Sequence, residues 1–186
     1  MNPSSFPRSI ALPVFALAAL SACRVEFDHE DGDRFQESFH ATFPLASGGR
    51  LSVDNENGSI DIATWDREEV EIDGAKFASS EELLKDVRIE TNASSRDSVT
   101  VRTIRAVRTT LTHGNAGARY TIHVPKRVTL SRIRSTNGAI AVTGTEGTAS
   151  IESTNGALHL SHVAGSIEGR TTNGSIELDL CKGDLR

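Results

Sequence analysis

The most constraining feature of this sequence is the regular spacing of glycine in its C-terminal third. The chain has 186 residues and 15 glycines. Six of these glycines follow one another at intervals of nine residues: Gly138, Gly147, Gly156, Gly165, Gly174 and Gly183. Apolar residues generally stand two and four positions after each glycine, as Ile140 and Val142 do after Gly138. Each unit is therefore predicted to be a turn glycine followed by a short strand with one apolar face.

A fuller identity recurs at twice this spacing. Thr-Asn-Gly occurs three times at intervals of eighteen residues, with its asparagines at Asn137, Asn155 and Asn173. A nine-residue unit is too short for a crossover through a helix, which needs about a dozen residues. Two such half-coils predict an all-β solenoid, a parallel β-helix or β-roll with 18-residue coils. Two inward columns are then expected: Ile140, Leu158 and Ile176 in one, and Val142, Leu160 and Leu178 in the other.

Asn-Gly is also a favoured dipeptide of tight β-hairpins, so an antiparallel β-sandwich stays an alternative fold. Upstream, Asn57 and Gly58 precede apolar residues at the offsets of the repeat, and Ile122 stands eighteen residues before Ile140. Between them, residues 63–119 have irregular spacings that predict inserted segments or a capping region. Within that region, a serine cap followed by acidic residues predicts a short helix over 79–86.

Residues 1–22 have the pattern of a secretory signal peptide. Arg8 precedes an apolar run over 10–20 that is too short to span a bilayer comfortably. The segment Leu20-Ser21-Ala22-Cys23 resembles the lipobox of bacterial lipoproteins, in which the cysteine is acylated and becomes the mature N-terminus. An ordinary signal peptide and an uncleaved membrane anchor are the alternatives. Residues 23–37 are acidic and predict a solvated tether, followed by a folded domain over 38–186.

Composition and motifs argue against several classes of function. The formal net charge is −5, and no basic stripe occurs, so we expect no nucleic-acid partner. The sequence lacks local nucleophile–base, zinc-site and phosphate-loop motifs, so we predict neither a catalytic site nor a metal or other cofactor.

One group of polar residues is brought together by strand alternation. His159, Glu177 and Asp179 are expected to point outward on one face, with His159 one coil below Glu177. Such a trio could bind a metal or perform acid–base chemistry on a polysaccharide. Solvated surface residues are the simpler interpretation. The single tryptophan, Trp65, is expected to close the edge of the core.

Several segments carry a resemblance to a known family: LSVDNENGSIDIATWDREEVEI, SSEELLKDVRIE and the repeats STNGAI, STNGAL and TTNGSI. Over roughly residues 40–186 they resemble the bacterial envelope family labelled "putative adhesin", a domain of unknown function. The resemblance implies a right-handed β-solenoid, often lipidated or membrane-anchored, without a catalytic motif. Relatives carry more Asn-Gly coils, whereas this chain stops at Cys181–Arg186 with the glycine interval still running. We therefore expect either a truncated chain or association through an open end.

Together these features predict a non-catalytic envelope lipoprotein that presents a β-solenoid for adhesion, binding or scaffolding. Its expected partners are the membrane, through the lipid on Cys23, and an envelope protein, a polysaccharide or a second copy of the chain. Arg24 rather than Asp follows the cysteine, which favours the outer membrane in a Gram-negative cell. A regulatory partner in envelope-stress signalling and a carbohydrate-active β-helix enzyme are the alternative functions.

Overall fold

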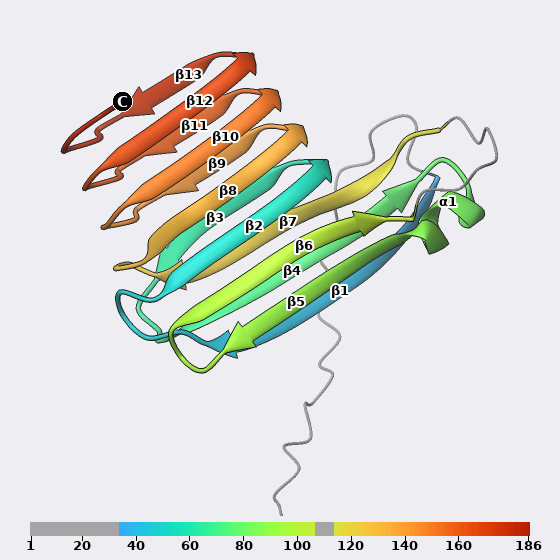
Figure 1. The fold of residues 1–186 in the computed structure, drawn as a ribbon, viewed down its shortest axis with the longest axis horizontal. Helices are drawn as coiled ribbons and strands as arrows, with labels where there is room; N and C mark the ends of the chain where they lie inside the picture. Colours follow the sequence, from blue (N-terminus) through green and yellow to red (C-terminus); the bar gives the residue numbers. More distant parts are fainter. Residues whose placement is uncertain (1–33, 107–113) are drawn as a thin grey trace, which may run out of the picture.

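The computed structural model describes residues 34–106 and 114–186, and the regular structure in this part of the chain is β-strand apart from one short helix (Figure 1). The prediction of an all-β chain is confirmed. The predicted lipidation site Cys23 and most of the tether lie outside the described residues. Among the described residues, no helix is both long and apolar enough to cross a membrane.

The elements in chain order are β1 (Phe35–Pro44), β2 (Arg50–Asn57), β3 (Ile60–Trp65), β4 (Glu69–Ala78), α1 (Glu81–Asp86), β5 (Val87–Ser94), β6 (Ser98–Arg105), β7 (Ala116–Pro125), β8 (Thr129–Asn137), β9 (Ile140–Thr143), β10 (Ala149–Asn155), β11 (Leu158–Ser161), β12 (Ile167–Asn173) and β13 (Ile176–Asp179).

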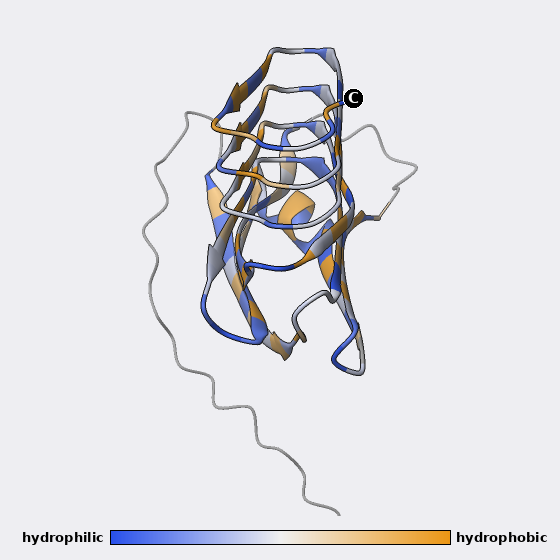
Figure 2. Ribbon diagram, turned by 90° about the vertical axis from the view of Figure 1, so that its left-hand side faces the viewer, coloured by the Kyte–Doolittle hydropathy of each residue, from blue (hydrophilic) through white to orange (hydrophobic). Residues whose placement is uncertain are grey.

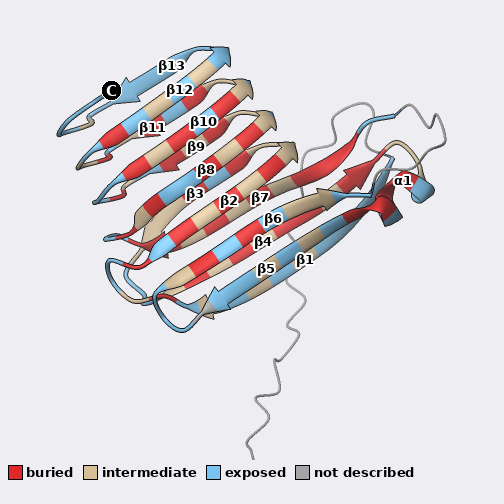
Figure 3. Ribbon diagram, in the orientation of Figure 1, coloured by how far each residue is buried: buried red, intermediate tan, exposed pale blue. Residues whose placement is uncertain are grey.

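The strands form two mixed sheets that face each other across one core (Figure 2). Sheet A has the order β1-β4-β7-β3-β9-β11-β13, and sheet B has the order β12-β10-β8-β2-β6-β5. Neither sheet closes on itself, and a sandwich has the same two-layer layout. Buried residues alternate with less buried ones along strands such as β2 and β7, because successive side chains point to opposite faces (Figure 3).

The C-terminal strands pair in parallel at the spacing of the sequence repeat. In sheet A, Leu158 of β11 lies between Ile140 of β9 and Ile176 of β13. In sheet B, Ser153 of β10 lies between Ser135 of β8 and Thr171 of β12. Identical positions of successive eighteen-residue units therefore lie side by side, because each unit has the same two connections between the sheets, with the same lengths.

The eighteen-residue period predicts that Ile122 pairs with Ile140, and this prediction is wrong. The neighbour of β9 is β3, in which Ile60 pairs with Ile140. Strand β7 lies on the far side of β3, and its Ile122 pairs with Ile62. The segment between β3 and β7 forms β4, α1, β5 and β6, and it adds antiparallel pairs to the other end of both sheets. These additions replace the regular period with longer and uneven strands.

In this region the structure confirms the predicted helix and changes the predicted boundary of the tether. The predicted short helix is confirmed as α1, where the Ser80 side chain accepts a hydrogen bond from the Leu83 backbone N–H. Glu81 and Glu82 lie in its first turn, where acidic side chains interact favourably with the helix dipole. Strand β1 begins at Phe35, so the last three residues of the predicted tether belong to this edge strand. They are ordered by antiparallel pairing with β4, a contact between distant residues that composition does not reveal.

Candidate binding surfaces

The structure brings together two of the three residues predicted as a surface site. His159 pairs with Glu177 in the parallel register, and the His159 Nδ1 atom lies 3.0 Å from Glu177 Oε2. Asp179 stands beside Ser161 instead. Both side chains of the ion pair are exposed, at 47% and 67%, so water weakens their attraction. His159 and Glu177 therefore form a solvated pair on the face of sheet A, and they belong to no cluster of three metal-ligating groups in the described part of the chain.

The asparagines of the repeat form a hydrogen-bonded ladder between successive strand connections. Asn173 Nδ2 donates to Asn155 Oδ1 at 2.8 Å, and Asn155 Nδ2 donates to Asn137 Oδ1 at 2.7 Å. Asn137 continues the ladder to Asn57 at 2.7 Å, although the two residues are 80 positions apart. The ladder ends where Asn57 donates to the Ala116 carbonyl. These side chains bind one another, which indicates a structural role.

The repeat glycines lie in turns, Gly183 after the last strand and the others between strands. At every one of them an added Cβ atom would collide with a neighbouring backbone carbonyl oxygen, and four of them also have a conformation that favours glycine. Gly58, Gly147, Gly165 and Gly183 have positive φ, a region that other residues rarely adopt. The repeat glycines with ordinary φ are Gly138, Gly156 and Gly174. At each of these three, a Cβ atom would collide with the carbonyl oxygen of the glycine in the preceding connection. Close approach of successive backbones therefore selects glycine at these positions.

The C-terminal end of the two-sheet stack leaves apolar side chains uncovered. Ile176 and Leu178 on β13 are 44% and 46% exposed, whereas Leu158 and Leu160 one strand earlier are buried. Strands β13 and β12 are the last strands of sheets A and B, and β13 is pale blue, hence exposed, along its length in Figure 3. Residues 184–186 pair with the start of β12. An open hollow of about 250 Å³ lies between the sheets at this end, lined by Leu160, Ile167, Gly169, Ile176, Leu178, Leu185 and Arg186. We call these lining residues the open end.

A second polar cluster, on the outer face of sheet A, is not apparent from the sequence. Glu71 and Asp73 of β4 lie near His123 of β7, and Trp65 of β3 stacks on the His123 ring with centroids 5.3 Å apart. Trp65 therefore packs on the outer face, and the expectation that it closes the core edge is wrong. In the sequence, only the alternation of Glu71 and Asp73 with apolar residues such as Val70 indicates that these two carboxylates share the outer face of a strand. Their meeting with His123 depends on the antiparallel register of β4 and β7.

Comparison with known proteins gives structural similarities only. No protein-family model and no curated protein matches the chain. A solved structure described as a "putative cell adhesion protein" from Clostridium sporogenes is 9% identical, with a TM-score of 0.43 over 80% of this chain and 97% of that one. A "putative adhesin" from Bacteroides fragilis is 7% identical, with a TM-score of 0.27 over 81% of this chain and 97% of that one. Membership of the family that the repeats resemble stays a prediction.

Proposed function

We propose that this chain is a non-catalytic binding or scaffolding protein of the bacterial envelope, anchored through Cys23, whose C-terminal strands form coils of a β-solenoid. Support for the coils comes from the parallel register of β8, β10 and β12 in one sheet and β9, β11 and β13 in the other. The lipobox-like sequence that ends at Cys23 supports the envelope location.

The observation that carries the proposed function is the open end. Fully burying a leucine side chain is worth about 1.5–3 kcal/mol, and about half of this remains to be gained at Leu178, which is 46% exposed. Its exposure therefore favours association. Strand β13 also presents backbone N–H and C=O groups along the edge of sheet A, which can accept an added strand. At the edge of sheet B, the backbone of Asp184 and Arg186 already pairs with Ile167 of β12.

The occupant that best fits this end is a second copy of the chain. Under two-fold symmetry, β13 of one copy would lie antiparallel to β13 of the other. At the edge of sheet B, residues 184–186, which pair with the start of β12, would meet their counterparts. Sheet A would then continue across the interface, and the apolar columns ending at Ile176 and Leu178 would be covered by identical columns. Each copy would contribute the same β13 edge and the same exposed apolar side chains, as a two-fold interface requires.

Light scattering after size-exclusion chromatography tests this proposal on the chain without its signal peptide. We expect a dimer for the unmodified chain and a monomer for Leu178→Lys, because a lysine ammonium is costly to bury at an apolar interface. Phe35→Lys is the matched control, since Phe35 is an exposed apolar residue of β1 at the opposite end of sheet A. It should leave the dimer intact. A monomeric unmodified chain at about 100 μM would exclude even a weak dimer and overturn the proposal.

A further inference from the structure

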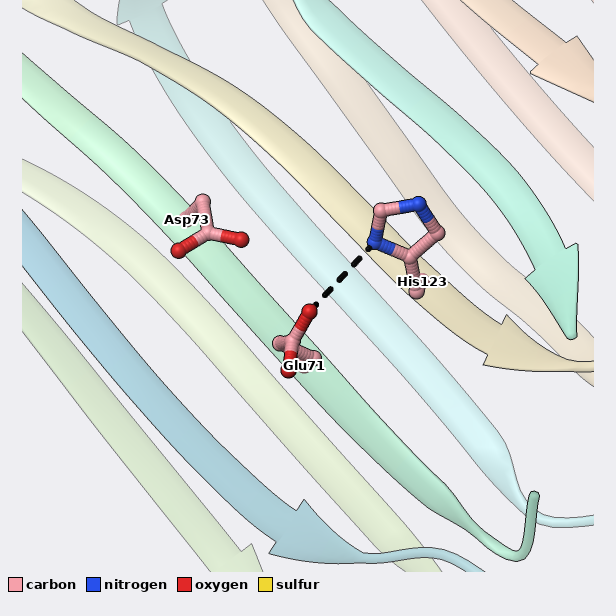
Figure 4. Close-up of side chains that lie close together, drawn as sticks. All are labelled: Glu71, Asp73 and His123. Carbon is pink, nitrogen blue, oxygen red and sulfur yellow. Dashed lines mark ion pairs between the residues drawn. The ribbon is translucent and has the colours of Figure 1, made fainter. Parts of the chain in front are cut away.

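Strands β1, β4 and β7 build a group of metal-ligating side chains on the outer face of sheet A. Val70 and Ile72 of β4 are fully buried, so Glu71 and Asp73 between and after them point away from the core. In the antiparallel register, Glu71 lies opposite His123 of β7. Figure 4 shows the two carboxylates and the imidazole converging from these neighbouring strands.

The distances within this group suit a small cation. One ligand atom from each of Glu71, Asp73 and His123 lies within 4.8 Å of the others, and His123 Nδ1 is 3.7 Å from Glu71 Oε1. Ligand atoms bound at about 2.1 Å to a tetrahedral zinc ion lie about 3.4 Å apart. Modest side-chain rotations would therefore bring the three atoms to coordinating positions.

The His123 imidazole has an unmet hydrogen-bonding capacity. Its Nδ1 atom is buried and has no hydrogen-bond partner among the described residues. A buried ring nitrogen without a partner is uncommon, because burial without a hydrogen bond costs free energy. The nearest carboxylate oxygen, at 3.7 Å, is too distant for a hydrogen bond but is placed to share a cation with it.

Surrounding residues hold two of the three ligands, His123 and Asp73, in place. Trp65 stacks on the His123 ring at an interplanar angle of 22°, and its own Nε1 donates to the Glu69 carbonyl at 2.9 Å. His40 of β1 contacts Asp73, with His40 Nδ1 2.7 Å from Asp73 Oδ1. A histidine bonded to a ligating carboxylate orients that ligand, as outer partners of metal ligands generally do.

From this arrangement we propose that Glu71, Asp73 and His123 bind a divalent transition-metal ion, with zinc as the best match. One imidazole nitrogen and two carboxylate oxygens form a donor set that zinc accepts readily. Calcium and magnesium prefer oxygen ligands alone and more of them. The site lies on strands remote from the open end in the order of sheet A, so it is independent of the proposed dimer.

Zinc titration followed by tryptophan fluorescence tests this site. Trp65 is the only tryptophan of the chain and stacks on the proposed ligand, so zinc binding should change its emission. We expect one saturable transition, reversed by a chelator, and no transition with calcium or magnesium at the same concentrations. Calorimetric titration supplies the affinity independently of the fluorophore.

Variants distinguish a metal site from an ordinary cross-strand ion pair. His123→Ala and Asp73→Asn should each weaken zinc binding at least about 100-fold, and His40→Ala about tenfold, the usual effect of losing an outer partner. His159→Ala is the matched control, because His159 also contacts a carboxylate on sheet A but belongs to no three-ligand cluster among the described residues. It should bind zinc normally. Unchanged affinity in Asp73→Asn and His123→Ala, or no zinc binding by the unmodified chain, would overturn the proposal.

Discussion

At the scale of single residues, Tyr120 gives the clearest link between burial and chemistry. Its side chain is 1% exposed, and its hydroxyl lies 2.6 Å from Thr103 Oγ1. Tyr120 belongs to β7 of sheet A and Thr103 to β6 of sheet B, so this hydrogen bond connects the two layers. Burial disfavours the phenolate and raises the pKa of Tyr120 to about 12, although the bond to Thr103 opposes the shift.

The raised pKa of Tyr120 predicts a specific loss of stability at alkaline pH. The contribution of the buried Tyr120 phenol to the free energy of unfolding is fully present below pH 10, where the phenol is neutral in both the folded and unfolded states. This contribution is lost as the pH rises through about 12. Because the chain has one tyrosine, the absorbance of tyrosinate reports Tyr120 alone. A titration midpoint near pH 10 in the folded protein would contradict the prediction.

The variant Tyr120→Phe separates the hydrogen bond from the titration. We expect a loss of about 1 kcal/mol in the free energy of unfolding at pH 7, because the bond to Thr103 is removed. Between pH 10 and 12 the free energy of unfolding of the unmodified chain should fall toward that of this variant. Denaturant unfolding of both proteins at pH 7 and at pH 11 measures the difference.

At the scale of elements, the strand connections show why glycine recurs. The Gly156 backbone approaches the Gly138 carbonyl so closely that a Cβ atom would collide with it. Ser153 Oγ donates to the same Gly138 carbonyl at 3.1 Å, which fixes the connection from the inner side. The contact is between two backbones, so neither side can move away without disturbing the parallel register.

Substitution of two glycines tests this steric explanation. Gly156→Ala should destabilise the chain by about 2 kcal/mol or more, because the added Cβ atom would collide with backbone atoms of Gly138 and Ala139, which cannot move as a flexible side chain can. Gly169→Ala is the control, because its added Cβ would meet only Leu158 Cδ1 at an ordinary 3.7 Å. That variant should be neutral or more stable by up to about 1 kcal/mol, since alanine restricts the unfolded chain. Thermal unfolding of the two variants should therefore give shifts of different size, and equal shifts would exclude the explanation.

The sequence predicted the elements well where each unit repeats the same short pattern. The contact of His159 with Glu177 followed from the eighteen-residue period. The contact of Glu71 with His123 could not be predicted, because it depends on two long strands that pair out of sequence order. Local patterns state which face of a strand is apolar, but they do not state which strand lies beside it.

At the scale of the whole molecule, the position of β3 also depends on pairing between segments that are distant in the sequence. Asn57 and Asn137 belong to one ladder, yet 80 residues separate them. The intervening segment returns through β4, α1, β5 and β6 and places β7 beside β3. The capping region was therefore anticipated as a departure from the period, whereas its antiparallel strands were not.

The predicted lipid anchor is testable in a bacterial host by metabolic labelling with a fatty acid. The unmodified protein should carry the label and sediment with membranes, because acyl chains partition into the bilayer. Cys23→Ser should lose both properties, and Cys181→Ser should keep them, since Cys181 lies far along the chain from the lipobox. Membrane association and processing that survive Cys23→Ser would contradict the anchor.

The most direct test of the proposed binding function is amide hydrogen exchange at the open end as a function of protein concentration. If two copies meet there, exchange in β13 (Ile176–Asp179) should slow markedly between about 1 μM and about 100 μM, while exchange in β1 stays constant. Leu178→Lys should abolish the concentration dependence. Exchange in β13 that is equally fast at both concentrations would contradict association through this end.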